Sequence, residues 1–382
     1  MNIYLDNAAT TPLSREAFLE MEPFLFGSFG NPSSSHSLGR ISRLALEKSR
    51  ATIAGYLNAE PAQIIFTSGG TEADNTAIQS SIAAGVKRVI TSALEHHAVL
   101  NTLKVAEREN KIELVYLEND HKGNISITAL DRLLQDEKPT LISLMHGNNE
   151  IGNLNPILDI ADLAEHYGAI FHSDTVQTMG HIRYNTRLLG PDFLVGSAHK
   201  FHGPKGVGFL YAKDPGKVLP LISGGSQENR KRGGTENVAG IVGMAAALAK
   251  SYQHLDRHEA YILFLKERLI NGLRDIPGIH FNGLSANLEQ SLSTVLSISA
   301  DQNDRDVDLL TLLDQEGICA SGGSACSSGN PSHVIQALGG KAGQDTLRFS
   351  FSRYNTGSEI DRLLSVIQGL STNTVLNRSL SA

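Results

Sequence analysis

The chain has 382 residues, of which 41% are hydrophobic and 19% charged, a composition typical of a soluble globular protein with enough residues for about two domains. Lysine and arginine total 33 against 40 aspartates and glutamates, and the resulting net charge of −7 argues against nucleic acid or an anionic membrane as a partner. The two cysteines, Cys319 and Cys326, are too few for a disulfide framework, a zinc ribbon or an all-cysteine iron-sulfur cage, so we expect no bound metal and a reducing, cytoplasmic location.

The first two thirds of the chain alternate between two kinds of segment. Short runs of strand-forming residues, each followed by polar or glycine-rich residues, lie at 63–67, 88–91, 140–145, 169–172 and 192–196. Helical stretches lie between them at 35–57, 71–84, 98–108 and 157–166. This alternation predicts an α/β fold with a mostly parallel sheet covered on both faces, and a further strand at 206–211 can return antiparallel.

The pattern changes in the last third. The apolar stretch 238–249 is a dozen residues long, well short of the ~20 that a membrane span needs, and predicts a buried helix. A helical region at 252–274 is followed by more widely separated strands at 294–299 and 346–351. We therefore expect a large domain over 16–257 and a smaller C-terminal domain over 258–382.

We expect binding and catalytic residues directly after the predicted strands, because open α/β sheets bind ligands beyond the carboxyl ends of their strands. The strand at 63–67 is followed by a turn rich in glycine and hydroxyl groups, 67–75, which opens a helix. Backbone amides and the helix dipole make such a turn an anion site, although a simple helix cap explains it equally well when it is taken alone. It lacks the lysine and spacing of a nucleotide P-loop, which favours the phosphate of another cofactor.

Asp174 and Lys200 follow two neighbouring predicted strands. Any such pair can be a surface salt bridge. Together with the phosphate-type turn, however, they supply what pyridoxal phosphate requires: a lysine for the Schiff base, an acid for the ring nitrogen and a phosphate cradle.

Ten motifs in register extend this pattern over nearly the whole chain. They are LDNAATTP (5–12), FGNPSS (29–34), TSGGTEADN (67–75), EHHAV (95–99), HGNNEIG (146–152), SDTVQ (173–177), SAHKFHGPKG (197–206), RGGTENVAG (232–240), SGGSACSSG (321–329) and LRFSFSR (347–353). By these motifs the chain resembles cysteine desulfurases of the NifS and IscS type, in the class V aminotransferase group. The resemblance implies the pyridoxal-phosphate transferase fold of type I, with a mostly parallel seven-stranded sheet in the large domain, an α+β small domain, and an N-terminal segment, 1–15, that packs with the small domain.

The resemblance also implies a role for individual residues. Lys200 would hold the cofactor and move the Cα proton, Asp174 would pair with the ring nitrogen, Gln177 would touch the phenolate oxygen, and His96, or else His97, would stack on the ring. The phosphate would be bound by Thr71, Ser197, His199, the amide of Gly70 and, from a second subunit, Thr235. Asn149, Asn31 and Arg348 are candidates for the substrate carboxylate, and Asn149 is also expected to touch the cofactor.

The two cysteines differ in their surroundings. The apolar neighbours of Cys319 predict a thiol that is packed in the protein core. The serine- and glycine-rich stretch 321–332 around Cys326 is instead typical of an exposed loop. In the family this cysteine attacks the sulfur of the substrate, and we expect His96 to help ionise it. The loop after Cys326 is two residues shorter than in many relatives.

The predicted function is the conversion of L-cysteine to L-alanine, with the sulfur kept as a persulfide for iron-sulfur cluster assembly or another delivery route. The expected partners are a second copy of the chain and a sulfur-acceptor protein such as an iron-sulfur scaffold. A selenocysteine lyase, or another class V aminotransferase or lyase that needs no Cys326, is the alternative. A further alternative is a non-enzymatic scaffold protein that binds iron or sulfur, although two cysteines are few for such a protein.

Overall fold

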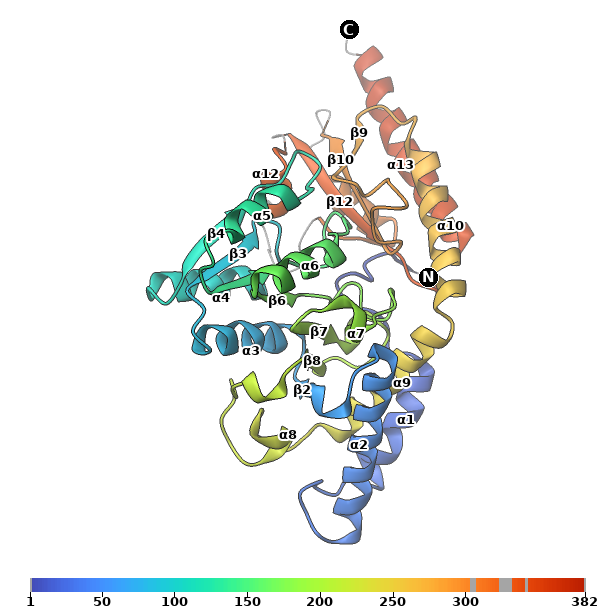
Figure 1. Cartoon of the computed structure of the whole chain (residues 1–382). Helices are drawn as coiled ribbons and strands as arrows, with labels where there is room; N and C mark the ends of the chain where they lie inside the picture. The colour runs from blue at the N-terminus through green and yellow to red at the C-terminus, as the bar shows by residue number, and fades with distance from the viewer. Residues whose placement is uncertain (1, 303–306, 323–331, 341–342, 381–382) are drawn as a thin grey trace.

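The computed structural model describes residues 2–302, 307–322, 332–340 and 343–380 (Figure 1). Within these residues the chain forms a large sheet of seven strands in the order β2-β8-β7-β6-β5-β3-β4. The strands are β2 (Ile64–Thr67), β3 (Arg88–Ser92), β4 (Glu113–Leu117), β5 (Thr140–Ser143), β6 (Ile170–Ser173), β7 (Phe193–Ser197) and β8 (Gly208–Ala212). Strands β3 to β7 pair in parallel, and β8 runs antiparallel to both of its neighbours, so the predicted α/β fold is confirmed.

Helices cover both faces of this sheet. The longer ones are α1 (Arg15–Phe26), α2 (Ser37–Leu57), α3 (Gly70–Ala83), α4 (His97–Arg108), α5 (Ile127–Leu134), α6 (Ile157–Tyr167) and α9 (Val238–Gln253). The short ones in this part of the chain are η1 (Pro61–Gln63), α7 (Thr186–Leu189), η2 (Ala198–Lys200), η3 (Pro215–Lys217) and α8 (Gln227–Arg230). Side chains of α2, α5, α6 and α9 share one hydrophobic cluster with one face of the sheet, and α3 and α4 pack on the other face. The apolar stretch at 238–249 lies in α9, and no helix in the described ranges is both long and apolar enough to cross a membrane.

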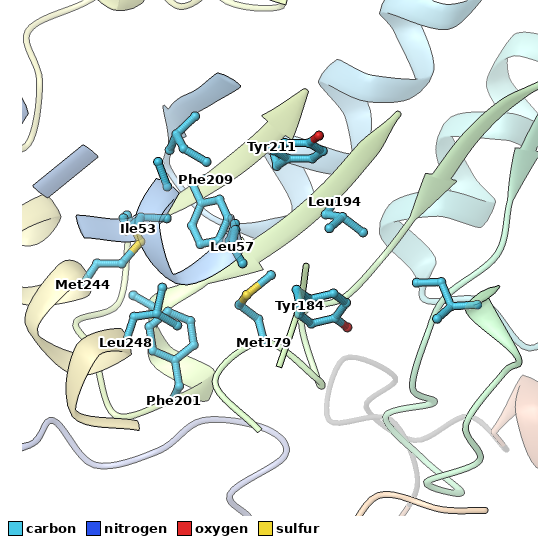
Figure 2. Packing of buried hydrophobic residues seen from close by; sticks show 14 of the residues in the cluster. Ile53, Leu57, Met179, Tyr184, Leu194, Phe201, Phe209, Tyr211, Met244 and Leu248 are labelled. Atoms are coloured by element: carbon cyan, nitrogen blue, oxygen red, sulfur yellow. The ribbon is translucent and has the colours of Figure 1, made fainter. Parts of the chain in front are cut away.

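The main core lies between α2, α9 and the β7–β8 part of the sheet. Phe209 and Leu194 come from the strands, Leu57 from α2 and Leu248 from α9, and all four are fully buried (Figure 2). Phe201, the residue after Lys200, is also fully buried in this cluster and lies beside Leu248 (Figure 2). The core therefore anchors the chain directly after β7.

A second hydrophobic cluster belongs to the last third of the chain. Its sheet has the order β12-β10-β9 and is antiparallel, and β1 pairs in parallel with β11. The strands are β1 (Ile3–Tyr4), β9 (Ile279–Phe281), β10 (Val295–Asp301), β11 (Ile318–Cys319) and β12 (Gln344–Ser350), and the helices are α10 (Leu255–Leu273), α11 (Leu309–Gln315), α12 (His333–Ala337) and α13 (Gly357–Leu380). Helices α10 and α13 lie side by side (Figure 1).

The N-terminal segment contributes to this second cluster, because Leu5 is fully buried there and β1 joins β11. The expected domain boundary between residues 257 and 258 falls in the first turn of α10. The division into domains at this boundary stays a prediction.

Lys266 of α10 is fully buried, and its Nζ donates to Ser291 Oγ and to the Leu292 carbonyl, both at 2.7 Å. Burial lowers the pKa of Lys266 from 10.5 to about 7. Since the unfolded chain then binds more protons between pH 7 and 10.5, the free energy of unfolding rises with pH across this window, by at most about 1.4 kcal/mol per pH unit. We expect Lys266→Met to flatten this rise.

The measurement is urea unfolding of both proteins at pH 7 and pH 10, with Lys213→Met as the control because Lys213 is exposed. Equal pH dependence in wild type and Lys266→Met would show that the buried amine does not titrate in this window.

Candidate active site

A cavity of about 210 Å³ lies where β6, β7 and the start of α3 meet the N-terminal segment and β12. Its walls come from regions that are far apart in sequence. The lining residues are Ala8, Ala9, Gly70, Thr71, Asp74, His96, Met145, Gly147, Asn149, Asp174, Val176, Gln177, Ser197, His199, Lys200 and Arg348.

Most of the residues predicted from the sequence meet in this cavity. Those that line it are Gly70, Thr71, His96, Asn149, Asp174, Gln177, Ser197, His199, Lys200 and Arg348. Asn31 and Thr235 are exposed and do not line it. Cys326 lies outside the described residues.

Lys200 ends the short helix η2, directly after β7. Its Nζ donates to the backbone carbonyls of Ala8, at 2.5 Å, and Ala9, at 2.9 Å. Gln177 Nε2 donates to the same Ala8 carbonyl at 3.0 Å. Two predicted site residues are thus held by the N-terminal segment, for which the sequence predicts no catalytic role.

The start of α3 lies at one end of the cavity. Gly70 is its first residue, and a Cβ there would lie 2.6 Å from Val176 Cγ2, so only glycine lets the helix begin this close to the loop after β6. Thr71 follows it, and Ser197 adds a hydroxyl from the end of β7. Backbone amides at a helix start and hydroxyl groups are the donors that bind phosphate.

His199 lies at the same end of the cavity. Its Nδ1 is 3.1 Å from Thr10 Oγ1, and burial together with the positive charges of Lys200 and Lys205 lowers its pKa to about 4. The ring is therefore neutral at pH 7. It can serve as a hydrogen-bond donor without adding charge.

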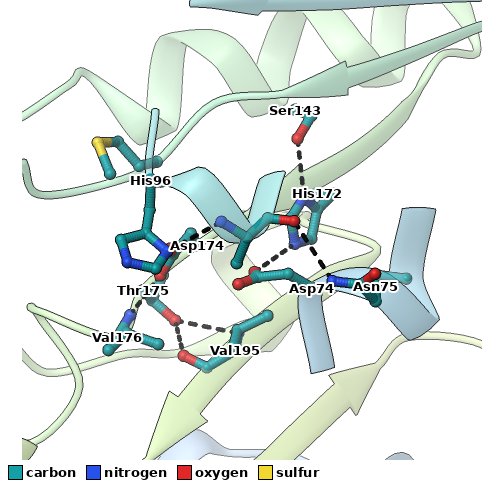
Figure 3. A network of polar contacts seen from close by, with 12 residues as sticks. Asp74, Asn75, His96, Ser143, His172, Asp174, Thr175, Val176 and Val195 are labelled. Atoms are coloured by element: carbon teal, nitrogen blue, oxygen red, sulfur yellow. Dashed lines mark hydrogen bonds and ion pairs between the residues drawn. The ribbon is translucent and has the colours of Figure 1, made fainter. Parts of the chain in front are cut away.

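Asp174 follows β6 and is 6% exposed, with Oδ1 accepting a hydrogen bond from the Val176 amide at 2.9 Å. Behind it lie two further buried groups, Asp74 of α3 and His172 of β6 (Figure 3). His172 Nε2 is 3.2 Å from Asp74 Oδ1, although not in hydrogen-bonding geometry, and its Nδ1 is 2.9 Å from Ser143 Oγ.

The protonation of this pair follows from its burial. Desolvation raises the pKa of Asp74, as do the charges of Asp174 and Glu95, and desolvation lowers the pKa of His172 to about 3. Both shifts favour neutral forms at pH 7.

Asp74 was not predicted, although it stands inside the TSGGTEADN motif. The sequence does contain a sign of its importance. Asp74 stands four residues after Gly70, which places it on the face of the helix that packs against the sheet. A carboxyl on such a face is either paired or functional.

His96 caps α4, and its Nδ1 accepts a hydrogen bond from the Ala98 amide at 3.1 Å. Burial lowers the pKa of His96, although the negative charge of Asp174 opposes this shift. A neutral ring whose Nδ1 accepts must carry its proton on Nε2. In this tautomer His96 is a hydrogen-bond donor, so the predicted role as the base that ionises a thiol requires loss of the Ala98 bond. That role stays a prediction.

Arg348 of β12 is 1% exposed. Nη1 donates to the Asn149 carbonyl at 2.9 Å and Nη2 donates to Asp6 Oδ1 at 2.8 Å, while Nε has no hydrogen-bond partner among the described residues. Arg348 lines the cavity, and a guanidinium is suited to a small carboxylate because it can donate two parallel hydrogen bonds.

Comparison with known proteins places this geometry in a family. The model of the aminotransferase class-V family matches residues 3–363. The chain belongs to this family. It is 41% identical over 375 residues to the cysteine desulfurase IscS of Dictyoglomus turgidum, an alignment that covers 96% of this chain and 93% of the relative.

Solved structures agree with this assignment. A NifS-like protein superposes with a TM-score of 0.89 at 34% identity, covering 97% of this chain and all of the other. A structure described as SspA in complex with cysteine superposes with a TM-score of 0.79 at 30% identity, covering 93% of this chain and 100% of the other. The predicted resemblance and fold type are confirmed.

Class V aminotransferases depend on pyridoxal phosphate, so the predicted cofactor is confirmed at the level of the family. The cavity fits it: Lys200 could supply the amine, Asp174 a carboxylate for the ring nitrogen, and Thr71, Ser197 and the α3 amides the donors for the phosphate. In the described part of the chain, no three His, Cys, Asp or Glu side chains are grouped to hold a metal ion.

Proposed function

We propose that the chain is a cysteine desulfurase, which converts L-cysteine to L-alanine and retains the sulfur as a persulfide on Cys326. The observation that carries the proposal is the meeting of Lys200, Asp174 and Arg348 in one cavity. The names of the 41% identical relatives support the same reaction for this family member.

Each of these residues has a task in the reaction. When bound, pyridoxal phosphate accepts the electron pair left on the substrate Cα and so makes its proton removable. Arg348 binds the substrate carboxylate, and Lys200 Nζ removes the Cα proton. Asp174 keeps a proton on the ring nitrogen, since a buried carboxylate beside a cationic nitrogen favours the charged pair. Asn149 and Gln177 line the wall beside them and are proposed to orient the bound molecules.

The sulfur step is proposed for Cys326. Its thiolate attacks the substrate sulfur, a sulfur–sulfur bond forms and the Cβ–sulfur bond breaks. The electron pair of the broken bond stays on the carbon side, which takes up a proton and leaves as alanine. Atoms balance as cysteine plus thiol giving alanine plus persulfide, with no external oxidant.

The oligomer and location are also proposals. Large apolar side chains on α1, on α2 and in the turn between them are 43–77% exposed, among them Phe18, Phe26, Phe29 and Leu44, which supports burial against a second copy of the chain. The exposed Thr235 would then serve the partner's phosphate site. We place the dimer in the cytoplasm, where it would pass its sulfur to an acceptor such as an iron-sulfur scaffold.

We expect Cys326→Ser to keep the bound cofactor and its visible absorbance but to lose persulfide formation and the coupled release of alanine. The measurement is alanine release from cysteine together with mass spectrometry of the protein persulfide. Cys319→Ser is the matched control, because Cys319 is half-buried in β11 and its carbonyl accepts from the Leu5 amide at 2.8 Å.

Alanine release by Cys326→Ser at the wild-type rate would contradict the proposal and favour another class V aminotransferase or lyase. Preferential turnover of selenocysteine by the unmodified enzyme would instead identify a selenocysteine lyase.

A further inference from the structure

The position of Lys200 depends on a turn with little regular structure. Helix η2 has only three residues, and His202 has φ of 67°, a left-handed conformation that costs energy for a residue with a side chain. Phe201 holds one side of this turn in the core. The other side faces the N-terminal segment.

Thr11 makes several of the contacts on that side, next to those of Thr10, Pro12 and Ser14, and is only 3% exposed. Its amide and its hydroxyl both donate to the His199 carbonyl, at 2.9 and 2.8 Å. The same hydroxyl accepts from the His202 amide at 2.8 Å. One side chain thus binds the residue before Lys200 and the second residue after it.

We propose that Thr11 is a positioning residue for Lys200: its hydroxyl fixes the 199–202 turn so that the lysine amine points into the cavity. A hydroxyl is required because it both donates and accepts, which valine of similar shape cannot do. This inference rests on the proposed role of Lys200 in holding the cofactor, and it does not depend on the sulfur chemistry.

Other contacts keep the surroundings in place when the hydroxyl is removed. Asn7 Nδ2 donates to the Ser350 carbonyl at 2.9 Å and the Ala8 amide donates to Ser350 Oγ at 2.8 Å, which hold the N-terminal segment. The Thr11 amide keeps its bond to His199. Loss of the hydroxyl therefore removes two of the hydrogen bonds that fix the 199–202 turn and leaves the rest of the cavity assembled.

The test compares two cofactor forms on the full chain. Pyridoxal phosphate has an aldehyde that bonds to Lys200, whereas pyridoxamine phosphate has an amine and binds only through its ring and phosphate. For Thr11→Val we expect about tenfold weaker binding of pyridoxal phosphate and a clearly smaller loss for pyridoxamine phosphate, which senses the turn only through His199 at the phosphate end, measured by equilibrium dialysis of the cofactor-free protein. Thr11→Ser keeps the hydroxyl and is expected to bind both as the wild type does.

Ser14→Ala is the matched control from the same segment. Its hydroxyl accepts from the Ala17 amide at the start of α1, and the contact of Ser14 with His202 is made by its backbone amide, which the variant keeps. We expect it to bind both cofactor forms as the wild type does.

Equal weakening of both forms in Thr11→Val would overturn the proposal, because it would indicate damage to the whole cavity, and so would unchanged binding of both. If Thr11→Val does not fold, as judged by circular dichroism, Thr11→Ala gives the same comparison. Release of alanine by the unmodified enzyme is measured separately, so failure of the desulfurase assignment is distinguishable from failure of this one.

Discussion

Lys200→Ala is expected to abolish turnover of cysteine, with a fall in kcat of about four orders of magnitude, the upper range for loss of a positioned proton-transfer group. The variant loses both the amine that attaches the cofactor and the group that removes the Cα proton. Its fold should persist, because Phe201 remains in the core and the Ala8 carbonyl keeps its hydrogen bond from Gln177.

The measurements are alanine release, visible absorbance of the bound cofactor and thermal unfolding. Lys213→Ala is the control, since Lys213 is an exposed lysine beyond the end of β8. Turnover within tenfold of the wild type would rule out Lys200 as the catalytic lysine.

Arg348→Lys should lower kcat/KM for cysteine by about 10- to 100-fold, the loss expected when one or two hydrogen bonds to a charged group are removed. Lysine keeps the positive charge beside Asp6. It lacks the planar guanidinium, whose several N–H groups can donate to Asp6, to the Asn149 carbonyl and to a substrate carboxylate at the same time. We expect the effect chiefly in KM.

Cysteine methyl ester supplies the internal control, because it lacks the carboxylate. The variant should lose most of the preference for cysteine over the ester, while urea unfolding reports any loss of the Asp6 contact. Unchanged discrimination between the two would mean that another residue, such as Asn149, binds the carboxylate.

Local sequence patterns predicted most elements of the large sheet, because strands such as β3 and β5 are short, wholly buried runs. Strand β4 was missed, since Glu113 and Tyr116 are exposed at the sheet edge and interrupt its apolar pattern. An edge strand contributes fewer buried side chains and so gives a weaker signal.

The candidate site was predictable where a motif follows a strand, as for Asp174 and Lys200. The contacts that hold those residues were not. The bonds of Ala8, Ala9 and Thr11 to the Lys200 turn join segments 188–192 residues apart, and all three use backbone carbonyls as acceptors, which any residue type could supply. No local spacing reveals such contacts.

The link between Asp6 and Arg348 spans 342 residues, and it has a consequence for synthesis on the ribosome. At about 5–20 residues per second, the segment that carries Asp6 waits roughly 17–70 seconds before β12 exists for it to bind. Until then Leu5 has no finished core to enter, and the nascent chain exposes it to chaperones and proteases. Cofactor capture by Lys200 is therefore expected only after translation of β12, however early the large sheet folds.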